Sequence, residues 1–164
     1  MEILRSRLLD AFAHGFTTRR GGGSRPPFDA ANLGGGVGDD PGAVEANWEA
    51  LRRETGLGFA RVRQVHGDRV LLARAAGAPA EEADAIVSLA PGVAACVAVA
   101  DCVPILLADP RSGAAAAVHA GWRGTLARIV ARTVERMQQA YDSRPQDLRA
   151  ALGPAIGEIG RAHV

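Results

Sequence analysis

Between residues 61 and 120 the sequence is a succession of short apolar runs separated by turn residues. Runs of this length, bounded by Gly, Pro, Asp and Ser, are typical of β-strands. A turn at residues 109–113 lies between two such runs and predicts a hairpin. The predicted strands cover residues 62–65, 70–73, 85–88, 93–100, 103–108, 114–118 and a last segment near 148–152.

Two helices are expected around these strands. Asp40 and Pro41 supply an N-cap and a favoured first helical residue, and Gly56 ends the helix. The second helix is expected to follow the glycine-flanked segment 121–124, and its inward face is predicted from the spacing of Leu126, Ile129, Val130, Val134 and Met137. Strands that occur both in hairpins and around helices predict an α/β-type (α+β) sandwich, a mixed β-sheet with helices packed on it.

Composition restricts the class of protein. The 164 residues are enough for one domain with a buried core, and no interdomain linker is visible. A formal net charge of +1 argues against nucleic acid or an anionic membrane as partner, so we expect small molecules. The two cysteines, Cys96 and Cys102, are not expected to form a disulfide, and no signal peptide or membrane span is visible. These features predict a cytoplasmic protein.

His66, Cys102 and His119 each lie where a predicted strand stops. Two imidazoles and a thiolate form a suitable ligand set for zinc, and three protein ligands leave a fourth position for water or substrate, as in catalytic sites. Taken singly, each residue also has a plainer explanation as a core or surface side chain. Asp101, next to Cys102, is either an outer partner that orients a histidine or acts in acid–base catalysis, or a strand cap. Asp84 and Cys96 are interpreted as structural.

The segment after His119 has its own chemistry. Two glycines enclose Trp122 and Arg123 and open onto the predicted helix. A helix N-terminus and an arginine fork both favour an anion, which makes Arg123 a candidate phosphate ligand. The alternative is a capped helix with a surface arginine and an anchoring tryptophan.

Seven segments together resemble the laccase-domain family, also called the polyphenol oxidase or purine nucleoside phosphorylase family. In chain order they are HGFTTR at 14–19, NLG at 32–34, GDDP at 38–41, QVHG at 64–67, ADCVP at 100–104, HAGWRG at 119–124 and GPAIG at 153–157. The resemblance implies a YfiH-like cysteine hydrolase fold, related to that of cytotoxic necrotising factor. It also implies a zinc site at His66, Cys102 and His119, and a purine nucleoside pocket to which Arg19, Ser24, Asn32 and Arg123 contribute.

The activities implied by the resemblance are phosphorolysis of adenosine, inosine, guanosine and methylthioadenosine, and hydrolytic deamination of adenosine. Cys102, His119 and Arg123 are the expected catalytic residues. Copper-dependent oxidation of phenols ranks lower, because several coppers need many imidazoles and the chain has four histidines and no His-x-His pair. A single copper at the zinc site remains an alternative.

Two further alternatives stay open at this point. Cys102 as nucleophile with His119 or His66 as base would make a metal-free hydrolase, a chemistry that suits the removal of wrong residues from peptidoglycan precursors. A zinc-stabilised binding module without catalysis is the other alternative, and the open fourth coordination position and the arginine-rich loop argue mildly against it.

The end of the sequence departs from the family. The resemblance covers a single domain, residues 1–157, whereas relatives continue further. Residues 158–164 are encodable by a DNA sequence that contains the start of a common sequencing adapter, so we expect a non-native tail and a domain that is incomplete at its C-terminus.

Overall fold

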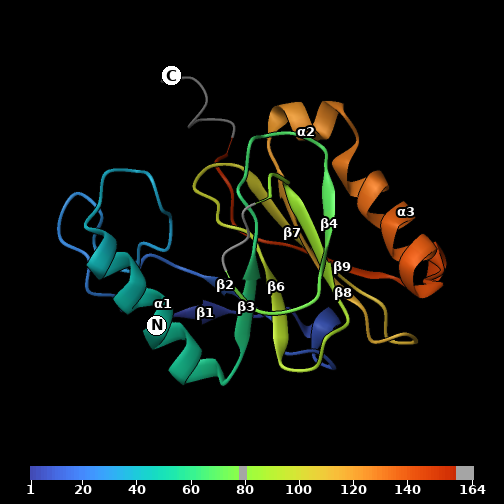
Figure 1. Cartoon of the computed structure of the whole chain (residues 1–164), viewed down its shortest axis with the longest axis horizontal. Helices are drawn as coiled ribbons and strands as arrows, with labels where there is room; N and C mark the ends of the chain where they lie inside the picture. Colours follow the sequence, from blue (N-terminus) through green and yellow to red (C-terminus); the bar gives the residue numbers. More distant parts are fainter. Residues whose placement is uncertain (78–80, 158–164) are drawn as a thin grey trace.

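The structure is a computed structural model that describes residues 1–77 and 81–157, so the expected tail lies outside the described residues. Its centre is a five-stranded sheet with the strand order β4-β5-β8-β7-β9 (Figure 1). β4 and β5 are parallel, and the other neighbours are antiparallel. The mixed sheet is therefore confirmed. Its strands are β4 (Val70–Ala73), β5 (Ala85–Ser88), β7 (Val103–Ala108), β8 (Ala115–Ala120) and β9 (Arg149–Leu152).

A second, two-stranded sheet lies against one face of the first. It consists of β3 (Gly58–Arg61) and β6 (Val93–Cys96), which run parallel. Ala60 of β3 packs with Ile86 and Ala117 of the large sheet, and all three are buried. The two sheets therefore form the sandwich that the sequence predicts.

The strand predicted at residues 62–65 is wrong, and the strand predicted at 93–100 is too long. Residues 58–61 pair one to one with residues 93–96, and both strands end together. Beyond them Gln64 donates to the carbonyl of Ala98 at 2.7 Å and accepts from its amide at 2.8 Å. A side chain thus replaces the backbone ladder, and residues 62–69 form a loop instead of a strand.

Helix α1 (Pro41–Thr55) covers the outer face of β3 and has the predicted ends. The Asp40 side chain accepts a hydrogen bond from the amide of Ala43 at 2.8 Å, and Gly56 adopts a left-handed conformation at the C-cap. Trp48 is 2 % exposed, and its ring lies 5.5 Å from that of Phe59. Local capping signals thus give the helix, and an aromatic pair fixes it on the sheet.

The predicted second helix is two helices, α2 (Trp122–Leu126) and α3 (Ile129–Tyr141). Arg128 between them has a left-handed conformation, with φ 63°. The break turns Leu126 outward, and its side chain is 79 % exposed, so its predicted inward position is wrong. Ile129 and Met137 of α3 are fully buried against the large sheet, as predicted. Figure 1 shows α1 and α3 on opposite sides of the strands.

The remaining elements are short. β1 (Ile3–Leu4) pairs with β2 (Phe16–Thr17), and two single turns of 3-10 helix cover Arg7–Leu9 and Pro145–Asp147. Residues 18–40 form a long loop beside α1, at the left of Figure 1. Among the described residues no helix is long and apolar enough to cross a membrane.

The register of the large sheet brings three strand ends together. Val103 is opposite Ala120, so Cys102 and Gly121 lie side by side just beyond the β7–β8 ladder. β5 is antiparallel to β8, with Ala85 opposite Val118, so Asp84 lies at the same end of the sheet as His119.

Candidate metal centre

The three residues predicted as metal ligands meet at that end of the sheet. The ligand atoms of His66, Cys102 and His119 all lie within 4.8 Å of one another. His66 is exposed, Cys102 is half-buried and His119 is buried, so the cluster is open on one side. Three ligands around an open side match a metal centre with a position left for a substrate.

His119, the last but one residue of β8, has one ring nitrogen engaged and one directed into the cluster. Its Nδ1 lies 2.7 Å from Oδ1 of Asp84. Its Nε2 lies 3.8 Å from the position that a Cβ on Gly121 would take, next to Cys102 and His66. Nε2 is therefore the nitrogen available to a metal.

His66 belongs to the loop that replaces the predicted strand. Its backbone is left-handed, with φ 59°, a conformation that costs a non-glycine residue about 1–2 kcal/mol. Its ring meets that of His119 edge to face, with 4.7 Å between ring centroids. Asp68 in the same loop forms an ion pair with Arg132 of α3 at 2.9 Å, which ties the loop to that helix.

Gly121 lies against all three ligands. A Cβ at this position would stand 3.2 Å from Sγ of Cys102 and 3.2 Å from Cδ2 of His66. These distances are shorter than ordinary van der Waals contact, so any side chain would press on the ligands. The other cysteine, Cys96, packs in the cluster around Trp48, where burial raises the pKa of its thiol to about 11 despite the opposing charge of Arg61. A protonated thiol is a poor ligand.

The carboxylate next to the cluster is Asp84, which the sequence led us to interpret as structural. It is fully buried and accepts hydrogen bonds from the amides of Val65, His66 and Gly67 at 3.2, 2.9 and 2.7 Å, besides its contact with His119. Burial would raise the pKa of Asp84, but the hydrogen bond with His119 and those from the three amides outweigh it and lower the pKa.

Asp101 does not take the place of an outer partner in this geometry. The residue is exposed, and its backbone carbonyl accepts a hydrogen bond from the amide of Ile156 at 3.1 Å. The position that orients a histidine is held by Asp84, from a strand end that is distant in sequence.

Arg123 lies two residues after Gly121, on α2. Its guanidinium lies over the ring of Trp122, 5.1 Å from the centroid, and Trp122 is 70 % exposed. α2 has only five residues, so its dipole adds little, and the guanidinium itself is the group that favours an anion here.

The other residues expected in a nucleoside pocket lie in the long loop beside α1. Arg19 is paired with Asp29 at 2.8 Å and is 72 % exposed. Ser24 is buried and accepts from Asn47 at 3.0 Å. Asn32 donates to Asp39 at 2.9 Å. In Figure 1 this loop lies apart from the strand end that carries the cluster. The described contacts connect these side chains to the loop itself and to α1.

A family model described as "Multi-copper polyphenol oxidoreductase laccase" matches residues 13–160. The chain belongs to this laccase-domain family. A protein of Mycobacterium tuberculosis named purine nucleoside phosphorylase is 47% identical over 144 residues, which cover 85% of this chain and 57% of that protein. A protein of Deinococcus radiodurans with the same name is 46% identical over 159 residues, covering 95% of this chain and 61% of the relative.

Solved structures of laccase-domain proteins have the same fold. The crystal structure of YlmD from Geobacillus stearothermophilus matches with a TM-score of 0.82 and 31% sequence identity, over 93% of this chain and 61% of that one. The chain thus spans about three fifths of the length of the relatives that it matches.

The donor set of this laccase-domain chain suits one metal ion. Among the described residues, the only group of three potential metal ligands that lie together is His66, Cys102 and His119. His14 is engaged elsewhere, because its Nε2 accepts from the amide of Ser6 at 2.9 Å and its Nδ1 faces the carbonyl of Phe12 at 2.9 Å. The described part of the chain therefore offers no second imidazole cluster for further coppers.

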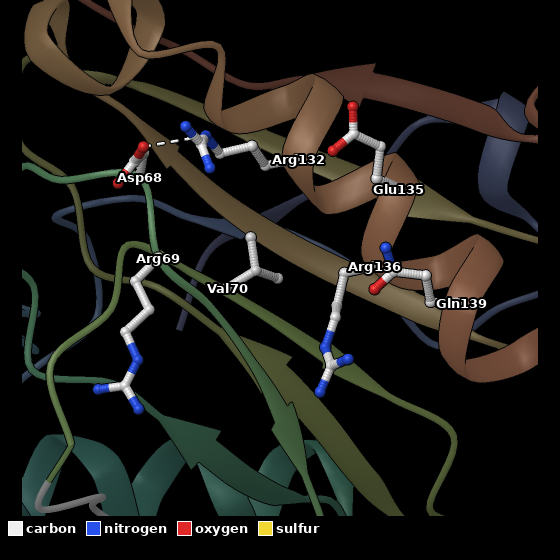
Figure 2. Close-up of a pocket in the computed structure, with 7 residues that line it drawn as sticks. All are labelled: Asp68, Arg69, Val70, Arg132, Glu135, Arg136 and Gln139. Carbon is white, nitrogen blue, oxygen red and sulfur yellow. Dashed lines mark ion pairs between the residues drawn. The ribbon is translucent and has the colours of Figure 1, made fainter.

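A shallow hollow of about 370 Å³ lies beside the cluster, between β4 and α3 (Figure 2). Figure 2 shows Arg132 directed at Asp68, while Arg69 and Arg136 point away from this pair. Arg69 is itself paired with Glu81 at 2.6 Å. None of the residues predicted as ligands or pocket residues lines this hollow, which is a charged surface held together by ion pairs.

Proposed function

We propose that this chain carries the metal centre of a zinc-dependent purine nucleoside phosphorylase, with zinc held by His66, Cys102 and His119. The observation that carries the proposal is the meeting of two imidazoles and a thiol within 4.8 Å in a cluster that is open on one side. Names of relatives at 46% and 47% identity support the nucleoside as substrate. The single three-ligand cluster supports one catalytic zinc over a multicopper centre, and a single copper at the same ligands is the alternative.

The proposed reaction is phosphorolysis. An oxygen of inorganic phosphate attacks C1′ of the ribose, the bond between C1′ and N9 of the purine breaks, and the base leaves as it takes up a proton. Ribose 1-phosphate and free purine are the products. When bound, zinc supplies a Lewis acid that polarises a donor atom or lowers the pKa of a water molecule.

The chain's own residues bind the phosphate and the nucleoside in this proposal. Arg123, exposed next to the cluster, binds phosphate through its guanidinium fork. Arg19, Ser24 and Asn32 shape the nucleoside pocket from the long loop, and for Arg19 this requires release from Asp29. Adenosine, inosine, guanosine and methylthioadenosine are the proposed substrates. The same centre also catalyses hydrolytic deamination of adenosine in this proposal.

A second candidate function rests on a specific contact. Cys102, His119 and Asp84 follow one another as thiol, imidazole and buried carboxylate, with 2.7 Å between His119 and Asp84. Nucleophile, base and orienting acid in this order are the parts of a cysteine hydrolase. A metal-free hydrolase that acts on peptidoglycan precursors is therefore the alternative; a copper-dependent polyphenol oxidase and a zinc-stabilised binding module rank below it.

Metal analysis together with adenosine turnover separates these functions. The chain and its Cys102→Ala variant are assayed with and without phosphate. We expect about one zinc per chain, as for a three-ligand site, and adenine release that requires phosphate, with both lost in the variant. Inosine formed without phosphate identifies deamination. A metal-free chain with Cys102-dependent hydrolysis would replace the phosphorylase by the thiol hydrolase.

A further inference from the structure

Asp84 contacts two of the three segments that carry the ligands. Its Oδ1 faces Nδ1 of His119 at 2.7 Å and accepts from the amide of His66 at 2.9 Å. Its Oδ2 accepts from the amides of Val65 and Gly67 at 3.2 and 2.7 Å. The carboxylate is fully buried on the residue before β5, whose backbone amide donates to the carbonyl of Arg69 at 3.1 Å and whose carbonyl accepts from the amide of His119 at 2.7 Å.

The three backbone amides indicate which atoms around this carboxylate donate hydrogen bonds and which accept them. An amide N–H only donates, so both oxygens of Asp84 act as acceptors. Toward an ionised Asp84 the ring of His119 donates from Nδ1, and in the neutral ring Nε2 then keeps the lone pair. Nε2 is the atom that faces Cys102 and His66, as its position near Gly121 shows.

The same carboxylate holds a strained loop. His66 has φ 59°, and the amides of residues 65, 66 and 67 all point to Asp84. These three hydrogen bonds to a buried charge offset the cost of the left-handed backbone, which amounts to about 1–2 kcal/mol. His66 is exposed, so few packing contacts hold it, and the amide bonds fix its direction.

We propose that Asp84 is the positioning residue of this centre: it selects the His119 tautomer with its lone pair on Nε2 and fixes the loop that presents His66. The metal-binding part of this inference rests on the proposed function, because His66, Cys102 and His119 are the zinc ligands there. Outer partners of this kind change metal affinity about 10–100-fold.

Asparagine has the shape of aspartate but does not replace it here. In one orientation the amide NH₂ of Asp84→Asn faces the N–H groups of Val65 and Gly67. In the other it faces Nδ1 of His119 and the amide of His66, and a neutral imidazole then moves its proton to Nε2. Either orientation disturbs one ligand segment while the volume stays the same.

The first experiment determines the tautomer of His119 by ¹⁵N NMR of the imidazole nitrogens, in the metal-free chain and at a pH at which the ring is neutral. We expect the proton on Nδ1 in the wild type. In Asp84→Asn we expect either a shift of the proton toward Nε2, or an unchanged tautomer with displaced amide signals of residues 65–67 if the amide oxygen still faces His119. Asp109→Asn is the matched control, because Asp109 is also 0 % exposed and accepts hydrogen bonds, but contacts no ligand. An unchanged His119 tautomer together with unchanged amide signals of residues 65–67 in Asp84→Asn would overturn the proposal, because either orientation of the new amide group must disturb one of the two. If Asp84→Asn does not fold, a proton on Nε2 in the wild type overturns it and a proton on Nδ1 supports it.

The second experiment measures zinc affinity by competition with a chelator. Asp84→Asn should bind zinc about 10–100-fold more weakly than the wild type, and Asp109→Asn should bind it equally well. Equal affinity of wild type and Asp84→Asn contradicts a positioning role toward the metal. A wild type that binds no zinc contradicts the proposed function instead, and the tautomer then decides separately whether Asp84 orients His119.

Discussion

A fully buried aspartate lies at each end of the β7–β8 hairpin: Asp109 in its turn, and Asp84, the residue before β5, beside its open end. At the turn, Asp109 accepts from the amide of Arg111 at 2.9 Å and the hydroxyl of Ser112 at 2.7 Å, both within three residues. At the open end, Asp84 accepts from a loop 17 to 19 residues before it and faces a histidine 35 residues after it. The first carboxylate closes the turn, also accepts a hydrogen bond from Ser143 and contacts no candidate ligand, whereas the second joins two segments that carry candidate ligands.

The contrast assigns a stabilising role to the aspartate at the turn and a functional role to the aspartate at the open end. Ser112 and Arg111 have no chemistry to perform, so replacing Asp109 should cost folding energy alone. The neighbours of Asp84 include two candidate ligands, one of them in a strained backbone. Strain at such positions persists where the surroundings enforce it and is frequent at functional sites.

Of the proposed variants, His66→Gly should have the largest effect, a loss of zinc affinity at the open end of the hairpin. Loss of a direct ligand should weaken zinc binding by more than about 100-fold, since loss of an outer partner alone costs about 10–100-fold. Glycine adopts φ 59° without strain, so the metal-free variant should be up to about 1 kcal/mol more stable than the wild type. Chelator competition and urea denaturation measure the two effects; retained affinity would show that His66 is not a ligand.

Asp109→Asn should have the next largest effect, confined to stability. Burial would raise the pKa of Asp109, but hydrogen bonds from Ser143, Ser112 and the amide of Arg111 outweigh it and lower the pKa to about 2. A folded-state pKa below the unfolded value of 3.8 stabilises the fold by about 2 kcal/mol above pH 4. This contribution is lost as the pH falls through about 2.

The matching measurement is urea denaturation of wild type and Asp109→Asn between pH 7 and pH 2. The difference in unfolding free energy should be largest above pH 4 and should shrink toward pH 2. A difference that stays constant over this range would mean that the charge of Asp109 is not what stabilises the turn.

Gly121→Ala should weaken zinc binding at the open end about 10-fold. Its Cβ would stand 3.2 Å from Sγ of Cys102 and press on the ligand. The backbone has φ −73°, which alanine adopts freely, so the melting temperature of the metal-free chain should hardly change. A much lower melting temperature together with unchanged zinc affinity would contradict the expectation that Gly121 affects zinc binding and not stability.

Gly113→Ala should have the smallest effect, again confined to stability. Gly113 has φ 79° in the turn, and an added Cβ meets only Leu89, at 3.6 Å. The expected loss is about 1 kcal/mol from the left-handed backbone, with zinc affinity unchanged. Urea denaturation and chelator competition test both statements, and weaker zinc binding would show that the two ends are coupled.

The same contrast explains which features the sequence predicted. Asp40, Pro41 and Gly56 define α1 through contacts within a few residues, so its ends were predicted correctly. The apolar runs of β4, β5 and β7 were also predicted, because each is continuous and bounded by turn residues. Features that depend only on residues close in sequence can therefore be predicted without knowledge of the fold.

Errors arose where the deciding contact is distant. Residues 62–65 look like a strand, but the pairing of residues 58–61 with 93–96 ends the ladder before them. Leu126 fits the helical period, yet the left-handed Arg128 breaks the helix. For Asp101 the sequence left open a role as outer partner or as strand cap, whereas Asp84, interpreted as structural, reaches His119 through the β5–β8 register. The three candidate ligands were nevertheless proposed from sequence, because two imidazoles and a thiol suit zinc and because the family resemblance implies this set.

The two tryptophans have an optical consequence. Trp48 is 2 % exposed beneath α1, and Trp122, the residue after Gly121, is 70 % exposed. Their emission should therefore separate into a short-wavelength component from the core and a long-wavelength, quencher-accessible component from the open end. The chain thus contains one internal fluorophore for unfolding and another for events at the strand ends, and both signals are available without any added label.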